Sequence, residues 1–218
     1  MNARRVQELA LRSPAGVLRA LHDTPAVPWP GRGPRAAVVC HPHPQYGGTM
    51  DNKVVFTVAR SLVERGVHVL RFNFRGAGGS EGVHDAGRGE VDDARAAIDL
   101  AATLAGDAGA TGGLLVAGFS FGAYVGLSAA RDDARVGALL AIAPPVNHYD
   151  FTAIAAGSRP LTVVYSDADE LVPAREVAAF VASCARPPRV VRVHGSGHLF
   201  HGHLGAIRAA VDALLDEA

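Results

Sequence analysis

Short apolar runs alternate with amphipathic segments along most of the chain. Several runs are apolar throughout, as strands that are covered on both faces must be. Between them, apolar positions recur every three or four residues, which predicts helices with one buried face. This alternation predicts an α/β fold with a mainly parallel sheet and helices on both faces. The expected strands are residues 36–40, 67–74, 114–118, 136–142, 161–165 and 190–193.

The expected helices begin and end at residues of suitable chemistry. Asp51 can cap the first helix, and Gly66 fits its end. The second helix has an acidic first turn and an apolar stripe that begins at Val91, and Gly106 can end it. Three further helices are expected over residues 120–130, 174–183 and 204–215.

The N-terminal part of the chain predicts less regular structure. Residues 16–22 can add an antiparallel strand at the edge of the sheet. The segment 24–34 is rich in proline and glycine, but too little chain precedes it to fold alone. We therefore expect a stiff connection there and one α/β domain over residues 1–218.

Size and composition support one well-buried core. The chain has 218 residues, of which 49% are hydrophobic, so the core needs no metal or disulfide to stabilise it. Lys and Arg number 21, as do Asp and Glu. Because these charges balance, the protein has no net positive charge that would attract a nucleic acid or an anionic membrane surface.

Two features of the sequence indicate the cellular compartment of the protein. No apolar run approaches the roughly 18 residues of a membrane span, so a cytoplasmic protein is expected. Cys40 and Cys184 are too few for a disulfide framework, and both thiols are expected to stay reduced.

The stretch GFSFG, residues 118–122, lies between an expected strand and an expected helix. Functional groups of parallel sheets gather at such junctions, where helix N-termini offer unpaired N–H groups. Glycines at 118 and 122 allow a sharp turn that lifts the oxygen of Ser120 into a cleft. Ser120 is therefore predicted to be a nucleophile, and the alternative is an inert turn serine.

A serine nucleophile needs a base and a third group that orients the base. Asp169 follows the expected strand 161–165 and is the acid predicted to project from its C-terminal end. Asp167 and Glu170 are rivals, and all three acids could instead be helix caps or solvated loop charges.

His198 is the predicted base, because the glycines at 195 and 197 let its loop reach over the serine. Activity should then fall as the pH drops and the imidazole is protonated. His201 and His203 could instead join His198 in a metal site, but no carboxylate or cysteine cluster accompanies them. The chain order Ser120, Asp169, His198 is that of one hydrolase architecture.

The sequence resembles the α/β-hydrolase superfamily, and within it the small bacterial hydrolases related to dienelactone hydrolase that lack a lid domain. The resemblance covers nearly the whole chain and is carried by HPHPQYGGTMDNKVV, RFNFRGAGGSEG, GFSFG, SDADELVP and GSGHLF. It implies serine-dependent hydrolysis of an ester-like bond, with Ser120, Asp169 and His198 as nucleophile, acid and base. Dienelactone hydrolase itself carries cysteine where this chain has Ser120, which leaves esterase or thioesterase action as the expectation.

An acyl-transfer site also needs N–H donors for the developing oxyanion. Phe121 is expected to supply the first. The family commonly has His-Gly before the second donor, whereas this chain has Pro42, which has no N–H. The alignment nominates the backbone of His43, with Gln45 and Tyr46 as alternatives.

Other segments suggest a substrate pocket and argue against a dinucleotide cofactor. Aromatic residues beside the predicted catalytic residues could wall an acyl pocket or simply belong to the core; they are Tyr46, Phe119, Phe121 and Phe200. The glycines of residues 76–82 do not complete a dinucleotide fingerprint because Glu81 stands at the last glycine position. Arg75 beside them can pair with a carboxylate or stay solvated.

The expected function is hydrolysis of a small-molecule ester or thioester through an acyl-enzyme, without a metal or an organic cofactor. The same three residues would serve a peptidase or an acyltransferase, and a binding protein on a hydrolase fold is a further alternative. The natural substrate, the preferred acyl length and the oligomeric state do not follow from the sequence.

Overall fold

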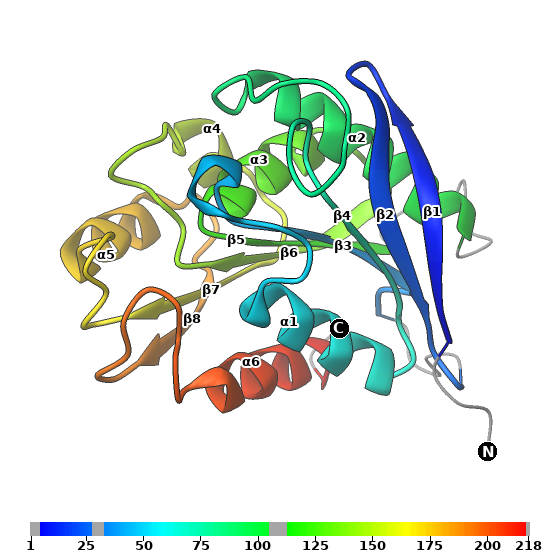
Figure 1. The fold of residues 1–218 in the computed structure, drawn as a ribbon. Helices are drawn as coiled ribbons and strands as arrows, with labels where there is room; N and C mark the ends of the chain where they lie inside the picture. The colour runs from blue at the N-terminus through cyan, green and yellow to red at the C-terminus, as the bar shows by residue number, and fades with distance from the viewer. Residues whose placement is uncertain (1–4, 28–32, 105–112, 217–218) are drawn as a thin grey trace.

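The computed structural model describes residues 5–27, 33–104 and 113–216, and one eight-stranded sheet runs through them (Figure 1). Its strand order is β1-β2-β4-β3-β5-β6-β7-β8. The strands are β1 (Arg5–Ser13), β2 (Gly16–Thr24), β3 (Ala36–Cys40), β4 (His68–Phe72), β5 (Leu114–Phe119), β6 (Val136–Ile142), β7 (Leu161–Ser166) and β8 (Arg189–Val193).

Strands β3 to β8 are parallel, whereas β1 and β2 pair antiparallel. The helices that connect them are α1 (Lys53–Glu64), α2 (Arg88–Leu104), α3 (Phe121–Ala130), α4 (Thr152–Ala155), α5 (Ala174–Ser183) and α6 (Leu204–Asp216). A short 3₁₀ helix, η1, covers Pro44–Tyr46. The predicted α/β fold is confirmed. No helix in the described part of the chain has the length and apolar character that a membrane crossing needs.

The N-terminal edge of the sheet differs from the prediction. Residues 16–22 belong to β2, which is antiparallel as expected but lies between β1 and β4. The edge is formed by β1, which the sequence pattern did not indicate. Most residues of β1 are exposed, so its sequence lacks the apolar run by which the other strands were recognised.

The first helix begins one residue later than predicted. Its N-cap is Asn52, whose side-chain oxygen accepts a hydrogen bond from the N–H of Val54 at 2.9 Å. The side chain of Asp51 is instead exposed and lies 3.6 Å from the guanidinium of Arg71. The expected end at Gly66 agrees with the structure, while Gly106 and part of the segment 24–34 lie outside the described residues.

The sheet separates two hydrophobic cores. Figure 1 shows α1 and α6 below the sheet and α2 and α3 above it. The first core contains residues of α1 and α6, among them Val58, Leu62 and Val211, which are fully buried. The second contains residues of α2 and α3, such as Ile98 and Leu127. Coverage of both faces explains why β3 and β5 are apolar throughout.

Helix α3 crosses β3 and β5 at very short range. A Cβ atom on Gly122 would lie 2.4 Å from the carbonyl oxygens of both Cys40 and His41, at the end of β3. A Cβ atom on Gly118 would lie 2.2 Å from the carbonyl oxygen of Gly122. Glycine is therefore required at both positions for the backbones to approach each other.

A buried histidine fixes the chain that leaves β3. His41 is inaccessible to solvent, and its Nε2 atom accepts a hydrogen bond from the N–H of Phe74 at 3.0 Å. Its Nδ1 atom lies 2.6 Å from the carbonyl oxygen of Pro42. Burial lowers the pKa of His41 from 6.5 to about 4, so the ring is neutral at neutral pH. The ring thereby links the loop after β3 to the loop after β4.

Replacing Gly122 by alanine should destabilise the fold, because the added methyl group would overlap two backbone oxygens. We expect the free energy of unfolding to fall by about 2 kcal/mol or more, measured by urea denaturation. Gly205 in α6 is a matched control, since a Cβ atom added there would have no neighbour within 4 Å. The Gly205→Ala variant should unfold at the same or slightly higher urea concentration. Equal stability of the two variants would contradict the close crossing.

The free energy of unfolding should fall as the pH is lowered from 7 to 5. The unfolded chain protonates His41 near 6.5, whereas the folded chain resists protonation down to about 4, so the unfolded state binds more protons in this window. His41 alone should contribute a loss of about 2 kcal/mol between these pH values. Burial also lowers the pKa of His22 and His68, which adds loss in the same direction. Urea denaturation of the His41→Gln variant should show a weaker pH dependence than that of the wild type; an equal dependence would exclude this role.

Candidate active site

Ser120 occupies the turn between β5 and α3 with a left-handed backbone, φ 53° and ψ −121°. Its N–H donates to the carbonyl oxygen of Ile142 at the end of β6, at 2.8 Å. Its own carbonyl oxygen accepts from the N–H of Ala123. The side chain makes no hydrogen bond to the start of the helix, so the hydroxyl is available to a partner outside the turn. This is the geometry that the motif GFSFG predicted.

His198 connects Ser120 to Asp169. Its Nε2 atom lies 2.9 Å from the Oγ atom of Ser120, and its Nδ1 atom lies 2.8 Å from an oxygen of Asp169. The imidazole is nearly buried, and the ring of Phe119 packs 5.3 Å from it, measured between centroids. Three segments, following β5, β7 and β8, therefore meet in one chain of hydrogen-bonded side chains.

The three acids that the sequence left as rivals have different partners. Asp169 contacts the ring of His198. Asp167 contacts the ring of His194 at 2.7 Å and accepts from the N–H of Gly195 at 2.8 Å. Glu170 accepts from the backbone N–H of His198 at 2.9 Å. Of these three acids, Asp169 is therefore the one that contacts the imidazole of His198, while Asp167 and Glu170 accept from backbone N–H groups of the histidine loop.

Hydrogen bonds keep Asp169 ionised despite its burial. Burial raises the pKa of this carboxyl, but the hydrogen bonds with His198 and with the N–H groups of Val172 and Leu171 outweigh that effect and hold the pKa below its usual range. One oxygen accepts from Leu171 at 2.8 Å and from Val172 at 2.9 Å, which leaves the other for His198. The acid is thus fixed in both charge and direction.

The loop after β3 lies against the start of α3. His43 caps η1, and its Nδ1 atom accepts a hydrogen bond from the N–H of Gln45 at 3.3 Å. The ring of His43 packs 4.8 Å from the ring of Phe121. The N–H of Phe121 is at the first position of α3, where no intrahelical partner exists. The assignment of Phe121 and His43 as oxyanion donors remains a prediction, as do Gln45 and Tyr46 as alternatives to His43.

The aromatic residues of the expected pocket divide into two groups. Phe119, Phe121 and Phe200 are buried, so burial favours the alternative that they belong to the core. Phe119 packs against both Phe200 and the ring of His198. Tyr46 is 88% exposed and lies beside His43. Only Tyr46 among the four presents a large surface to solvent.

A second carboxylate-histidine pair was missed by sequence reasoning. Glu90 is fully buried at the start of α2, and one of its oxygens lies 2.7 Å from the Nδ1 atom of His84. Its carboxylate also accepts from the N–H groups of Asp85 and Gly87, both at 2.9 Å. The acidic first turn had indicated only a favourable interaction with the helix dipole. No local pattern shows that a carboxylate there is buried.

The remaining candidates have structural roles. Arg75 pairs with the buried carboxylate of Asp93 at 2.8 Å, one of the two options that the sequence left open. Cys40 is a buried free thiol whose pKa is raised by burial, and Cys184 is also free. Among the described residues, no group of three or more His, Cys, Asp or Glu side chains is arranged to hold a metal ion, so His201 and His203 form no such site with His198.

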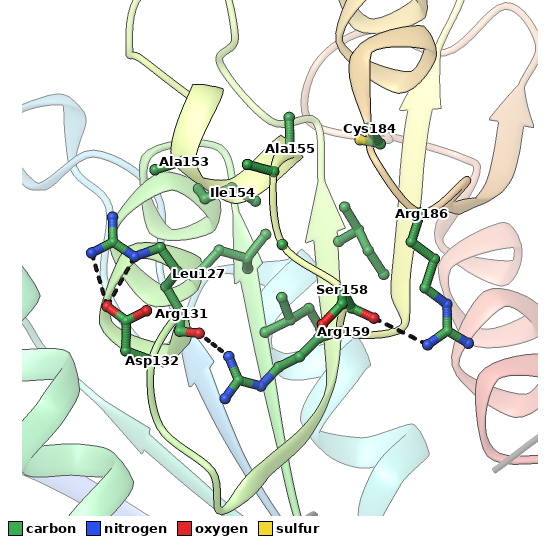
Figure 2. Close-up of a pocket in the computed structure, with 14 residues that line it drawn as sticks. Leu127, Arg131, Asp132, Ala153, Ile154, Ala155, Ser158, Arg159, Cys184 and Arg186 are labelled. Carbon is green, nitrogen blue, oxygen red and sulfur yellow. Dashed lines mark hydrogen bonds and ion pairs between the residues drawn. The ribbon is translucent and has the colours of Figure 1, made fainter.

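A pocket of about 520 Å³ lies away from these residues, between the end of α3, helix α4 and the start of β7. Figure 2 shows its aliphatic wall, with Leu127 and Ile154, and the arginines around it. Arg131 pairs with Asp132, and Arg159 and Arg186 donate to backbone oxygens. None of the predicted site residues lines this pocket.

Comparison with known proteins places the chain among hydrolases. An α/β serine hydrolase homologue from Coxiella burnetii is 37% identical with a TM-score of 0.85, covering 96% of this chain and 97% of that one. A lidless α/β serine hydrolase from Xanthomonas campestris is also 37% identical with a TM-score of 0.85, covering 98% and 94%. The chain is thus a small α/β-hydrolase without a lid, as the resemblance predicted.

Sequence comparison gives the same grouping. An uncharacterized protein of Rickettsia prowazekii (strain Madrid E) is 38% identical over 172 residues, which is 75% of this chain and 71% of that protein. The model of the X-Pro dipeptidyl-peptidase (S15) family matches residues 19–176, most of the chain and both the β3 loop and the serine turn. With this match and the hydrolase fold, the chain belongs to the X-Pro dipeptidyl-peptidase (S15) family.

Proposed function

We propose that the protein hydrolyses carboxylic esters or thioesters through an acyl-enzyme formed on Ser120. The observation that carries this proposal is the continuous contact of Ser120 Oγ with His198 Nε2 and of His198 Nδ1 with Asp169. A serine hydroxyl is a poor nucleophile by itself, and such an arrangement gives it both a base and an orienting acid.

In the first half-reaction, His198 Nε2 takes the hydroxyl proton of Ser120 while Oγ bonds to the carbonyl carbon. The carbonyl oxygen becomes an oxyanion, which the N–H groups of Phe121 and His43 stabilise. When this intermediate collapses, the bond to the leaving alcohol or thiol breaks, and His198 returns the proton to the leaving group. Ionised Asp169 stabilises the imidazolium between these steps.

In the second half-reaction, water replaces the alcohol. His198 takes a proton from the water molecule, whose oxygen bonds to the acyl carbon, and the bond to Ser120 then breaks. The proton passes to Ser120 Oγ, and the carboxylic acid leaves. These steps call on no metal or organic cofactor. The absence of a lid domain favours small or extended acyl substrates that enter from solvent.

A peptidase is the second candidate, because the matched family is named for X-Pro dipeptidyl-peptidases. The acyl-enzyme chemistry is the same for a peptide, and the leaving group is then an amine. Parallel assays with p-nitrophenyl acyl esters and an X-Pro p-nitroanilide distinguish the two. Faster turnover of the anilide would replace the esterase proposal with the peptidase.

A fluorophosphonate probe should label the wild-type protein on Ser120, because the probe reacts with serines that a neighbouring base has activated. Intact mass spectrometry should show one adduct on the wild type and none on Ser120→Ala. The matched control is Ser128→Ala, which changes another serine of α3 and should be labelled like the wild type. Equal absence of labelling in all three proteins would favour a binding protein on a hydrolase fold.

The Asp169→Asn variant should lose about 10³- to 10⁴-fold in kcat on p-nitrophenyl esters, because the amide no longer fixes the tautomer and charge of His198. Asp167→Asn is the control, since this partly exposed acid contacts His194 and not His198. Its kcat should stay within about tenfold of the wild type. A larger loss in Asp167→Asn than in Asp169→Asn would reassign the orienting acid.

A further inference from the structure

A small polar surface lies beside the residue that follows the proposed nucleophile. The rings of His43 and His84 lie 4.8 Å apart, and those of His43 and Phe121 are also 4.8 Å apart. The ring of His84 lies 5.7 Å from that of Phe121. The ring of Tyr46 also packs on that of His43, with centroids 4.9 Å apart. Two imidazoles therefore adjoin the side of the site where the oxyanion donors are proposed.

The two imidazoles are held in opposite tautomers. The Nδ1 atom of His43 accepts from the N–H of Gln45, so the proton of this neutral ring is on Nε2. Burial lowers the pKa of His43 and favours the neutral ring. The Nδ1 atom of His84 is 2.7 Å from the carboxylate of Glu90 and carries the proton there, although the contact is not aligned as a regular hydrogen bond. In the neutral form of this ring, the Nε2 atom is an acceptor.

Both Nε2 atoms are available to a ligand. Neither Nε2 atom has a protein partner among the described residues. The buried nitrogen that lacks a hydrogen-bond partner there is Nδ1 of His84, not either Nε2 atom. The side chain of His84 is 15% exposed, while Glu90 behind it is wholly buried. The carboxylate therefore contacts the ring at its buried Nδ1 atom, which leaves Nε2 for a ligand.

We propose that His43 and His84 form a donor–acceptor pair that recognises a hydroxyl group on an aromatic ring of the ester substrate. A hydroxyl group matches the pair because it accepts from the N–H of His43 and donates to Nε2 of His84. The neighbouring ring of Tyr46 offers a flat surface for the ring that carries the hydroxyl. This assignment rests on the proposed function, because it names the class of ester that the same site accepts.

The test compares methyl phenylpropanoate with its para-hydroxy and para-methoxy derivatives, and phenyl acetate with para-hydroxyphenyl acetate. These two sets place the ring in the acyl part or in the alcohol part. In the set that places the ring beside the histidine pair, kcat/KM of the wild type should be about fivefold higher for the hydroxy ester than for the unsubstituted ester. This is the factor expected of one neutral hydrogen bond. The methoxy ester should show a smaller advantage, because an ether oxygen cannot donate.

The variant His84→Phe keeps a ring of similar size on Phe121 but lacks the acceptor, so its preference for the hydroxy ester should disappear. His201→Phe is the matched control, because His201 is an exposed histidine outside the cluster, and it should keep the wild-type preference. A preference that is equal in the wild type and in His84→Phe, or absent from the wild type in both sets, would overturn the assignment.

A binding measurement separates this inference from the proposed function. In Ser120→Ala, which cannot form the acyl-enzyme, calorimetry should give a dissociation constant about fivefold lower for the preferred hydroxy ester than for its unsubstituted partner. Adding His84→Phe to this variant should make the two constants equal. If the wild type hydrolyses none of the esters, the proposed function fails, and the binding ratio still decides whether the pair recognises a hydroxyl group.

Discussion

The close crossing of α3 over β3 and β5 is the constraint on which the rest of the site depends. Backbone oxygens of Cys40 and His41 occupy the space where a side chain on residue 122 would begin. This approach holds Ser120 in a left-handed turn and brings the start of α3 against the loop after β3. The same packing therefore positions both the serine turn and the loop after β3, the two segments proposed to contact the carbonyl group of a substrate.

The parallel sheet supplies the other half of the arrangement. The segments that carry Ser120, Asp169 and His198 follow β5, β7 and β8, whose carboxyl ends lie at one edge of the sheet. Each acid near His198 has its own partner. Asp169 contacts the imidazole ring, Glu170 accepts from the backbone N–H of His198, and Asp167 accepts from the backbone N–H of Gly195. Fixing the loop at several points limits the entropy that would be lost in bringing the imidazole to the serine.

The histidines show how environment decides the use of one side chain. His41 is buried and neutral, and it ties two loops together. His198 lies between a hydroxyl and a carboxylate. His43 and His84 keep one nitrogen each free of protein partners among the described residues. Burial thus favours a neutral ring, while the partner of each nitrogen, a carboxylate or a backbone N–H, selects the tautomer.

The sequence alone determined the alternation of strands and helices. Strands that are covered on both faces must be apolar throughout, helices that cover them need one apolar face, and both patterns can be read from short stretches of sequence. It also indicated Ser120, Asp169 and His198, since glycines and strand ends mark where the chain can present them. Tertiary structure alone decided that β1 forms the edge, that Asn52 caps α1, and that Glu90 is buried against His84. These outcomes depend on which distant segments exclude water from a residue, and no local pattern encodes that exclusion.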